Sequence, residues 1–271
     1  MKNIKIYNLY SGSGGNSTFV RVGETAILID AGRNARMLCR ALGEIGEDIK
    51  NISAIFITHD HGDHTSALEV LSKKNDIPIY ITRQSAEKFS ADSCVRARLV
   101  ERDILFCESI GDIKISSFQT PHDSLMSVGY RIEYEDTDGI HAIGYATDIG
   151  YVSDSVRNGL LGCEAVIVEA NHDLDMLMSG PYPRELKTRV ASRRGHLSND
   201  DCATLSLELA QNGTRAIMLA HLSGENNEPY LAFDTVSSAL SGFDVDIFIA
   251  HPTSAVELVI PQKSEERICL R

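Results

Sequence analysis

The feature that most constrains this chain is a dense run of histidine and aspartate directly after an apolar, strand-like segment, residues 54–58: Thr58-His59-Asp60-His61-Gly62-Asp63-His64. Three histidines and two aspartates fall within six residues, whereas the whole chain has nine histidines. Imidazole and carboxylate are ligands suited to zinc, manganese or iron. Because Gly62 lets the backbone turn sharply, His59 and His61 can face one metal ion while Asp63 and His64 face a second. We therefore expect two divalent metal ions (Zn, Mn or Fe) at this loop.

Composition places the chain among ordinary globular proteins. It has 271 residues, of which 43% are hydrophobic and 24% are charged, and this length allows a substantial buried core. No run of 18 apolar residues occurs, so we expect no membrane-spanning helix and no membrane partner. The six cysteines are scattered and form no CxxC pair. This pattern favours a reduced, cytoplasmic protein over a disulfide framework.

Charge limits the contacts with nucleic acid that the chain can make. The net charge of −12 argues against nonspecific coating of nucleic acid, because proteins that do so are usually basic. A nuclease remains compatible with it, since bound divalent cations neutralise an acidic site. The most basic segment, residues 184–194, lies just before His196 and is either a phosphate clamp or a solvated helix face. Its cations are Arg184, Lys187, Arg189, Arg193 and Arg194, of which we expect Arg193 and Arg194 to contact substrate.

Strand and helix patterns alternate along the chain. Short runs rich in Ile, Val, Tyr and Thr predict strands at 4–10, 18–22, 25–30, 54–58, 78–82, 113–120, 127–134, 140–147, 164–170, 215–222, 244–251 and 255–260. Helices are predicted near 33–46, 63–74, 198–212 and 229–241. No long linker or short-period repeat separates these segments. We therefore expect one α/β domain, residues 1–271, with mixed sheets and interleaved helices.

The histidine run also carries a family resemblance. HxHxDH after a strand resembles the signature of the metallo-β-lactamase superfamily, and the similarity covers most of the chain. The resemblance implies the metallo-β-lactamase αββα four-layer sandwich, an α/β fold of two mixed sheets flanked by helices. Four further segments resemble motifs of the superfamily: 28–32 with Asp30, 120–123 with His122, 146–148 with Asp148 and 219–223 with His221.

Four other motifs narrow the resemblance to one branch. Residues 11–17 (SGSGGNS), 169–173 (EANHD), 195–199 (GHLSN) and 221–227 (HLSGENN) together resemble the YycJ/WalJ branch. That branch is similar to tRNase Z-type nucleases and is thought to contain 5′ exonucleases that act on DNA. The resemblance implies a metal-dependent phosphodiester hydrolase that digests DNA from a 5′ end in the 5′ to 3′ direction.

The resemblance also implies roles for the individual residues. It gives the first metal His59, His61 and His122, the second metal Asp63, His64 and His221, and both metals the bridging Asp148. A water between two such ions loses its proton easily and becomes the nucleophile, so Asp63 counts among the catalytic residues. His196 is the general-acid candidate, because it precedes a predicted helix much as a histidine does in tRNase Z-like proteins. The alternative for His196 is helix capping or packing.

Several polar residues are candidates for supporting roles. Asn16 and Ser17 add donors to the glycine-rich loop 11–17, whose N–H groups would hold a terminal phosphate, although the loop also reads as a plain turn. Asn226 is a further candidate for a substrate contact. Asp30 and His172 are candidates for orienting the metal ligands through hydrogen bonds. We expect His141 and His251 to be structural.

Other functions share these features. A ribonuclease fits the same residues, and so does a hydrolase of thioesters, lactones or cyclic phosphodiesters, because one fold hosts many hydrolyses. A noncatalytic scaffold is a third class, but a scaffold does not need every ligand. The sequence leaves open the native metal, DNA against RNA, the polarity of digestion and the oligomeric state.

Overall fold

Alternating apolar residues near the start of the chain form an antiparallel meander. In the computed structural model, which describes residues 2–261, it comprises β1 (Ile4–Tyr10), β2 (Ser17–Val22) and β3 (Thr25–Ile29). The meander continues through parallel strands into a seven-stranded sheet of order β14-β1-β2-β3-β4-β5-β6. The remaining members are β4 (Ala54–Phe56), β5 (Ile79–Thr82), β6 (Leu99–Arg102) and β14 (Val256–Glu257).

The second sheet also has seven strands, in the order β13-β12-β11-β10-β9-β8-β7. Antiparallel pairing links β7, β8, β9 and β10, and parallel pairing links β10, β11, β12 and β13. They are β7 (Cys107–Ile110), β8 (Ile113–Gln119), β9 (Val128–Asp136), β10 (Gly139–Ala146), β11 (Ala165–Glu169), β12 (Ala216–Ala220) and β13 (Asp246–Ile249). Both sheets are therefore mixed, as predicted.

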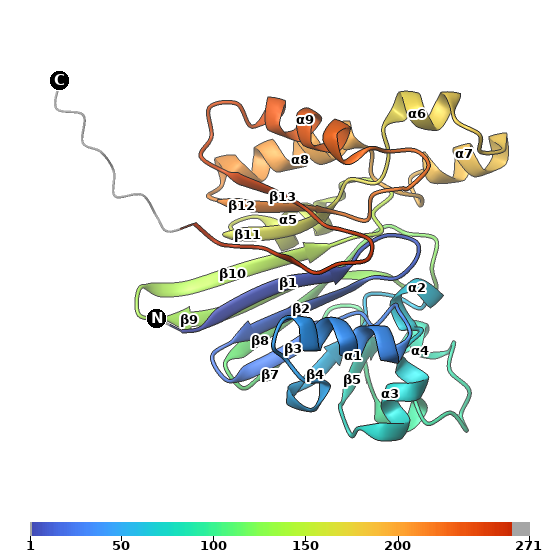
Figure 1. Ribbon diagram of the computed structural model, residues 1–271, viewed down its shortest axis with the longest axis vertical. Helices are drawn as coiled ribbons and strands as arrows, with labels where there is room; N and C mark the ends of the chain where they lie inside the picture. Colours follow the sequence, from blue (N-terminus) through green and yellow to red (C-terminus); the bar gives the residue numbers. More distant parts are fainter. Residues whose placement is uncertain (1, 262–271) are drawn as a thin grey trace.

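Helices cover the outer face of each sheet, which gives four layers (Figure 1). On the first sheet these are α1 (Ala35–Glu44), α3 (Leu68–Lys74) and α4 (Arg83–Ala86); on the second they are α5 (Asp154–Leu160), α8 (Asn199–Gln211) and α9 (Pro229–Ala239). The remaining α-helices, α2 (Gly62–Thr65), α6 (Leu174–Ser179) and α7 (Arg184–Val190), lie at one end of the sheets. The predicted αββα sandwich is confirmed.

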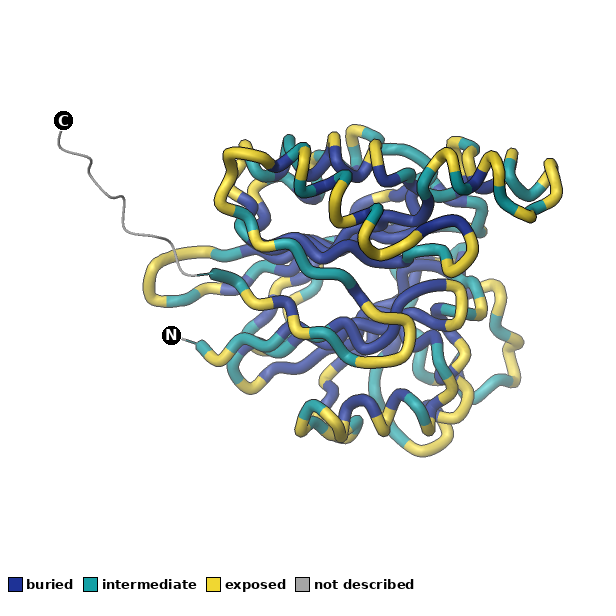
Figure 2. Tube along the Cα trace, turned by 45° about the horizontal axis from the view of Figure 1, so that its top comes forward, coloured by how far each residue is buried: buried dark blue, intermediate teal, exposed yellow. Residues whose placement is uncertain are grey.

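The core between the sheets consists of the apolar side chains that both sheets turn inward. Figure 2 shows the buried residues gathered along the strands of the two sheets. Phe56 of the first sheet stacks on Tyr80 and meets the edge of Tyr130 from the second sheet. The hydroxyl of Tyr130 donates to the carbonyl of Ile57 at 2.6 Å. This buried bond ties the second sheet to the backbone just before the histidine run, so the core also positions that loop.

One predicted element was wrong in its form. Residues 63–74 were expected to make one helix, but α2 and α3 are separate, with a break at Ser66 and Ala67. Ala67 N donates to the carbonyl of Ala31, and Ala31 N donates to the carbonyl of His64. The backbone here bonds to the loop after β3 instead of continuing one helix. The sequence patterns also gave no prediction of β6, β7 or α4 to α6, and they gave α7 only as one of two alternatives for residues 184–194.

The composition argues against membrane-spanning helices and against paired cysteines. No helix within residues 2–261 is long and apolar enough to span a membrane. Cys163 and Cys202 are buried, and the five cysteines in this part of the chain are free thiols. Cys269 and the last ten positions of the predicted domain 1–271 lie outside the described residues.

Candidate metal centre

The loop after β4 is held from behind by a buried carboxylate. Asp30, which follows β3, accepts hydrogen bonds from the backbone N–H of Thr58 at 2.8 Å and from its hydroxyl at 2.9 Å. Nδ1 of His64 donates to the same carboxylate at 2.7 Å. Asp30 and His64 are fully buried. Because Nδ1 is engaged, Nε2 is the nitrogen of His64 that faces the centre.

Three histidines form the first ligand group. His59, His61 and His122 each bring one ring nitrogen to within 4.8 Å of the others. Nε2 of His59 is buried and has no hydrogen-bond partner among the described residues. Burial lowers the pKa of His59 well below its usual value, which keeps the ring neutral, and a neutral ring can bind a metal. The donor set and the unpartnered nitrogen both fit a divalent metal ion.

Asp148 lies between two groups of side chains. Its Oδ2 is 3.3 Å from Nε2 of His64, and its Oδ1 is 3.1 Å from Nδ1 of His221. It also groups with His59 and His64 on one side and with Glu169, His196 and His221 on the other. Oδ2 is buried without a hydrogen-bond donor among residues 2–261. A carboxylate so placed offers one oxygen to each side of the centre.

The second side of the centre concentrates negative charge. Burial lowers the pKa of His221, but the Asp148 and Glu169 carboxylates together outweigh burial and raise the pKa to about 10. Likewise, burial lowers the pKa of His64, but Asp30 and Asp148 outweigh it and raise the pKa well above the usual value. Oδ2 of Asp63 lies 3.4 Å from Nε2 of His64. These carboxylates stabilise positive charge on the neighbouring histidines, which the raised pKa values reflect. A bound metal ion would displace the histidine protons and supply that positive charge instead.

Glu169 is a site residue to which the sequence analysis gave no role. It is fully buried at the end of β11, where it accepts from the backbone N–H of Ile149 at 2.7 Å and from Nδ1 of His196 at 2.7 Å. Burial raises the pKa of Glu169, but His196 outweighs burial and lowers the pKa to about 2. Its signal in the sequence is a lone acidic residue at the end of an otherwise apolar strand.

His196 is held in one orientation beside the metal-facing groups. Its Nδ1 donates to Glu169, which leaves Nε2 free to act on a substrate. Burial lowers the pKa of His196, but the Glu169 carboxylate outweighs burial and raises the pKa. His196 and His221 line a hollow of about 170 Å³, which also includes Asn226 and Tyr182. The 22% exposed His196 side chain is therefore at the wall of an accessible space.

Three site residues have left-handed backbone conformations. Asp30, Asp148 and His221 have φ values of 61°, 57° and 56°, and no other non-glycine residue within 2–261 has a positive φ. Each lies within two residues of the end of a strand: β3, β10 or β12. Such conformations are uncommon outside glycine and gather at functional sites. The backbone turns sharply at each of these residues, just after it leaves the strand.

The glycine-rich loop, residues 11–17, contacts the histidine run through Asn16. Asn16 is buried, and its Nδ2 lies 3.0 Å from Nε2 of His64 and 3.3 Å from Oδ2 of Asp63. Ser17 is fully buried, and its hydroxyl donates to the carbonyl of Asp30. We expected Ser17 to contact a substrate phosphate. Instead, its buried hydroxyl already donates to the backbone carbonyl of Asp30.

The other candidates for supporting roles lie in the loops after β11 and β12. Asn226 is buried, and its Oδ1 has no hydrogen-bond partner among the described residues. His172 is also buried and pairs through its backbone with Ser198, just before α8. Nδ1 of His172 has no partner in residues 2–261, so no hydrogen bond from this nitrogen to a metal-facing side chain is present.

The basic segment divides into two parts. On α7, Lys187 donates to the carbonyl of Met178, and Arg189 forms an ion pair with Asp123 at 2.6 Å. After α7, Arg194 donates to the carbonyl of His122, and the guanidinium of Arg193 lies 3.7 Å from the centre of the Tyr151 ring. The two consecutive arginines therefore lie next to the metal-facing loops.

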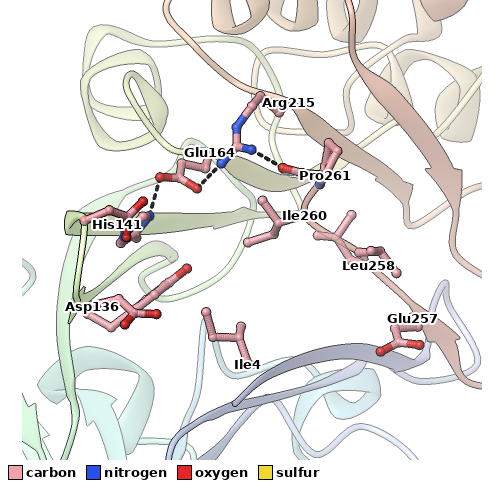
Figure 3. A pocket seen from close by; sticks show the side chains of 12 residues that line it. Ile4, Asp136, His141, Glu164, Arg215, Glu257, Leu258, Ile260 and Pro261 are labelled. Atoms are coloured by element: carbon pink, nitrogen blue, oxygen red, sulfur yellow. Dashed lines mark hydrogen bonds and ion pairs between the residues drawn. The ribbon is translucent and has the colours of Figure 1, made fainter. Parts of the chain in front are cut away.

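A larger hollow of about 340 Å³ is separate from this centre and lies beside the β9–β10 hairpin (Figure 3). His141 lies there between Asp138 and Glu164, and Glu164 also pairs with Arg215. Burial lowers the pKa of His141, but these two carboxylates outweigh burial and raise it. The charged groups satisfy one another, which supports a structural role for His141.

Comparisons with known proteins agree with this geometry. A family model described as a beta-lactamase superfamily domain matches residues 25–222, a span that includes all seven predicted metal ligands. The chain belongs to the metallo-β-lactamase superfamily. Among solved structures, YhfI from Bacillus subtilis, a metallo-β-lactamase fold protein, has a TM-score of 0.66 at 17% identity and covers 94% of this chain and 100% of its own.

Two curated members of the superfamily match nearly the whole chain. An exodeoxyribonuclease WalJ from Streptococcus pneumoniae is 32% identical over 260 residues, which cover 92% of this chain and 95% of the relative. An exodeoxyribonuclease YycJ from Bacillus anthracis is 32% identical over 252 residues, which cover 90% and 93%. The resemblance to the YycJ/WalJ branch is therefore confirmed.

Proposed function

We propose that this superfamily member is a metal-dependent phosphodiester hydrolase that digests DNA from a 5′ end. The observation that carries the proposal is the convergence of the metal-facing side chains around Asp148, in a chain that matches two exodeoxyribonucleases along nearly its full length. We further propose a cytoplasmic location, a reducing compartment with which the unpaired cysteines of residues 2–261 are compatible.

Two divalent ions fit the side chains at this centre. His59, His61 and His122 would hold the first, and Asp63, His64 and His221 the second, with one oxygen of Asp148 for each. The unpartnered atoms Nε2 of His59 and Oδ2 of Asp148 support this assignment. When bound, such a pair of ions, whether Zn, Mn or Fe, activates water and neutralises charge on the phosphate.

The residues of the chain itself orient the reaction. Asp30 fixes the ring of His64, so that Nε2 points into the centre. Glu169 fixes the ring of His196, and we assign His196 Nε2 as the donor of the proton to the leaving oxygen. Glu169 is a positioning residue in this scheme, because it acts through His196 and does not itself reach the substrate.

Local charge explains how an acidic chain can hold a polyanion. The net charge of −12 repels DNA at long range, so capture depends on groups close to the reacting phosphate. The metal ions supply one anchor. Arg193 and Arg194 supply another, since both lie beside the loop that carries His122.

The decisive experiment is digestion of end-labelled oligonucleotides by the metal-loaded protein. We expect mononucleotides to be released from the 5′ end of DNA, and Asp148→Asn to abolish this release. Single- and double-stranded DNA and RNA, each labelled at either end, are compared. Preference for RNA would replace the proposal with a ribonuclease. A protein that ignores both nucleic acids but hydrolyses a thioester or lactone would contradict it.

A further inference from the structure

We propose that a hollow next to the metal centre is a subsite for a nucleobase of the substrate, with Tyr151 and Arg193 as its stacking platform. The inference rests on the proposed nuclease function and deepens it, because it identifies what holds the nucleotide beside the reacting phosphate. It also predicts which DNA ends the enzyme accepts.

The hollow borders the metal centre. It has a volume of about 370 Å³, and His122, a predicted ligand of the first metal, forms part of its wall. Three loops line it, and each carries a residue of the site: His122, Asp148 or His196. The other walls include Pro121, Leu125, Met126, Tyr151, Arg193 and Arg194. A nucleotide whose phosphate lies at the metals can therefore place its base here.

The three loops are fixed against one another through their backbones. The N–H of Gly150 donates to the carbonyl of Pro121 at 2.7 Å. A Cβ added to Gly150 would lie 2.3 Å from the carbonyl carbon and oxygen of Arg193, so the two backbones are in direct contact. Ile149, between Gly150 and Asp148, is bonded to the buried Glu169. Tyr151 is thus held rigidly, three residues after Asp148.

The platform itself has the chemistry that unpaired bases favour. The Arg193 guanidinium carbon lies 3.7 Å from the centre of the Tyr151 ring, a close cation–π contact. Bases stack on aromatic rings and on guanidinium planes, largely without sequence preference. Arg193 is exposed and forms no ion pair within the described part of the chain, whereas Arg189 is neutralised by Asp123.

The remaining walls favour a nucleobase over a purely ionic ligand. Leu125 is 53% exposed beside the hollow and offers an apolar surface to the edge of a ring. Arg194 donates to the carbonyl of His122 and places a second cation beside the loop that carries this ligand candidate. Apolar walls next to cations match a base joined to a phosphate.

Occupation of this subsite has a consequence for specificity. A base in a duplex is paired and stacked, and it must leave both contacts to lie on Tyr151. We therefore expect single-stranded or frayed ends to be digested faster than blunt duplex ends.

The test compares normal and abasic nucleotides in single-stranded DNA. Oligonucleotides carry a tetrahydrofuran abasic residue at the first, second or third position from the 5′ end. The parent protein, loaded with manganese, should digest at least one of these about 5- to 100-fold more slowly than the normal strand, the range that stacking of one base supports. This measurement needs no variant and so does not depend on how a variant folds.

Variants then assign the effect to the platform. Tyr151→Ala should slow digestion of the normal strand and lose discrimination against the abasic one while it keeps the metal content of the parent. Tyr151→Phe should retain discrimination, because it keeps the ring. Tyr230→Ala is the matched control on the exposed surface of α9, and it should behave like the parent.

The outcomes separate this subsite from the proposed function. If the parent digests DNA but treats abasic and normal ends alike at every position, the subsite is wrong and the nuclease assignment stands. The same holds if Tyr151→Ala discriminates as well as the parent. If the parent digests no nucleic acid at all, both proposals fall.

Discussion

At the metal centre, the neighbours of each histidine decide what its free nitrogen can do. His59 is buried, and its Nε2 has no partner within residues 2–261, which suits a ligand. His64 is braced by Asp30, so its remaining nitrogen has a fixed direction. His196 is braced by Glu169 but is partly exposed, which suits an exchange of protons with a substrate. Two kinds of role therefore follow from the same side chain.

Replacement of His64 tests the ligand assignment. His64→Ala removes a metal-facing nitrogen and leaves the buried Asp30 without its ion-pair partner. We expect the loss of about one metal ion per chain, measured by plasma mass spectrometry, and turnover below detection. His251→Ala, at an exposed histidine, is the control. Full metal occupancy with a normal rate in His64→Ala would rule out the assignment.

Replacement of His196 tests the proton donor. His196→Ala should keep the metals but slow DNA cleavage by about 10²–10⁴-fold, because the leaving oxygen loses its donor. The loss should be smaller on bis(p-nitrophenyl) phosphate, whose nitrophenolate leaves without a proton. Equal losses on both substrates would argue that His196 binds a metal or supports structure. Glu169→Gln should reproduce the same pattern in a milder form.

Local clustering explains which residues could be found from the sequence. His59, His61, Asp63 and His64 form one short run, so residue type and spacing were enough. His122, Asp148 and His221 were located only through a family resemblance, since each stands alone after its own strand. Glu169 was missed because its role depends on His196, which lies 27 residues later and meets it only in the folded chain.

At the scale of elements, strands were predicted better than short helices. Each strand in the interior of a sheet had a sequence that was either wholly apolar or alternately apolar and polar. Both patterns are typical of strands, because successive side chains of a strand point to opposite faces of the sheet. The division between α2 and α3 had no such signal, because its cause is a bond between Ala67 and Ala31, far away in the sequence. Helices of four to seven residues, such as α4 and α7, are too short to show a periodic pattern.

A glycine at the junction of these elements gives a further prediction. A Cβ on Gly32 would lie 1.6 Å from the carbonyl oxygen of Asp63, so Gly32→Ala must push α2 away from the loop after β3. We expect a loss of about 1–3 kcal/mol in the free energy of unfolding and weaker metal binding, measured by urea unfolding and metal titration.

The control for Gly32 lies on α1. A Cβ on Gly43 has open space around it, and alanine favours a helix over glycine by about 0.5–1 kcal/mol. Gly43→Ala should therefore stabilise the protein slightly and leave metal binding unchanged. If both variants bind metal like the parent, the contact between Gly32 and Asp63 does not position the site.

At the scale of the whole molecule, the metal centre lies where the two sheets meet and ties them together. Ligand candidates come from the first sheet (His59, His61, Asp63, His64) and from the second (His122, Asp148, His221). The single domain predicted for residues 1–271 remains a prediction. A metal that joins both sheets would stabilise the sandwich as a unit.

Removal of the metal should therefore lower the thermal stability. A metal present at 1,000 times its dissociation constant stabilises the folded state by about 4 kcal/mol. Stripping it with EDTA should lower Tm by roughly 5–15 °C in a chain of this size, and added manganese or zinc should restore it. Scanning calorimetry measures both steps. An unchanged Tm would contradict a metal shared between the sheets.

The ion pairs of His141 predict a pH dependence away from the metal centre. Its pKa is raised in the folded state, so its contribution to stability is fully present below the unfolded value of about 6.5 and is lost as the pH rises through the folded pKa. The parent should therefore exceed His141→Gln in stability at pH 6, and the difference should shrink at high pH. Urea unfolding across this range measures it, and a difference independent of pH would contradict the ion pairs.

The three left-handed residues lower the stability of the backbone at positions where the side chain is needed for activity. Glycine at positions 30, 148 or 221 would relieve the backbone there, but it would also delete a carboxylate or an imidazole from the centre. A bound metal stabilises the fold by more than this relief, so only a screen for heat resistance run without metal would favour glycine at the ligand positions 148 and 221, and it would lose activity without any warning in the yield of folded protein. Anyone engineering this enzyme would have to select for turnover and thermal tolerance together.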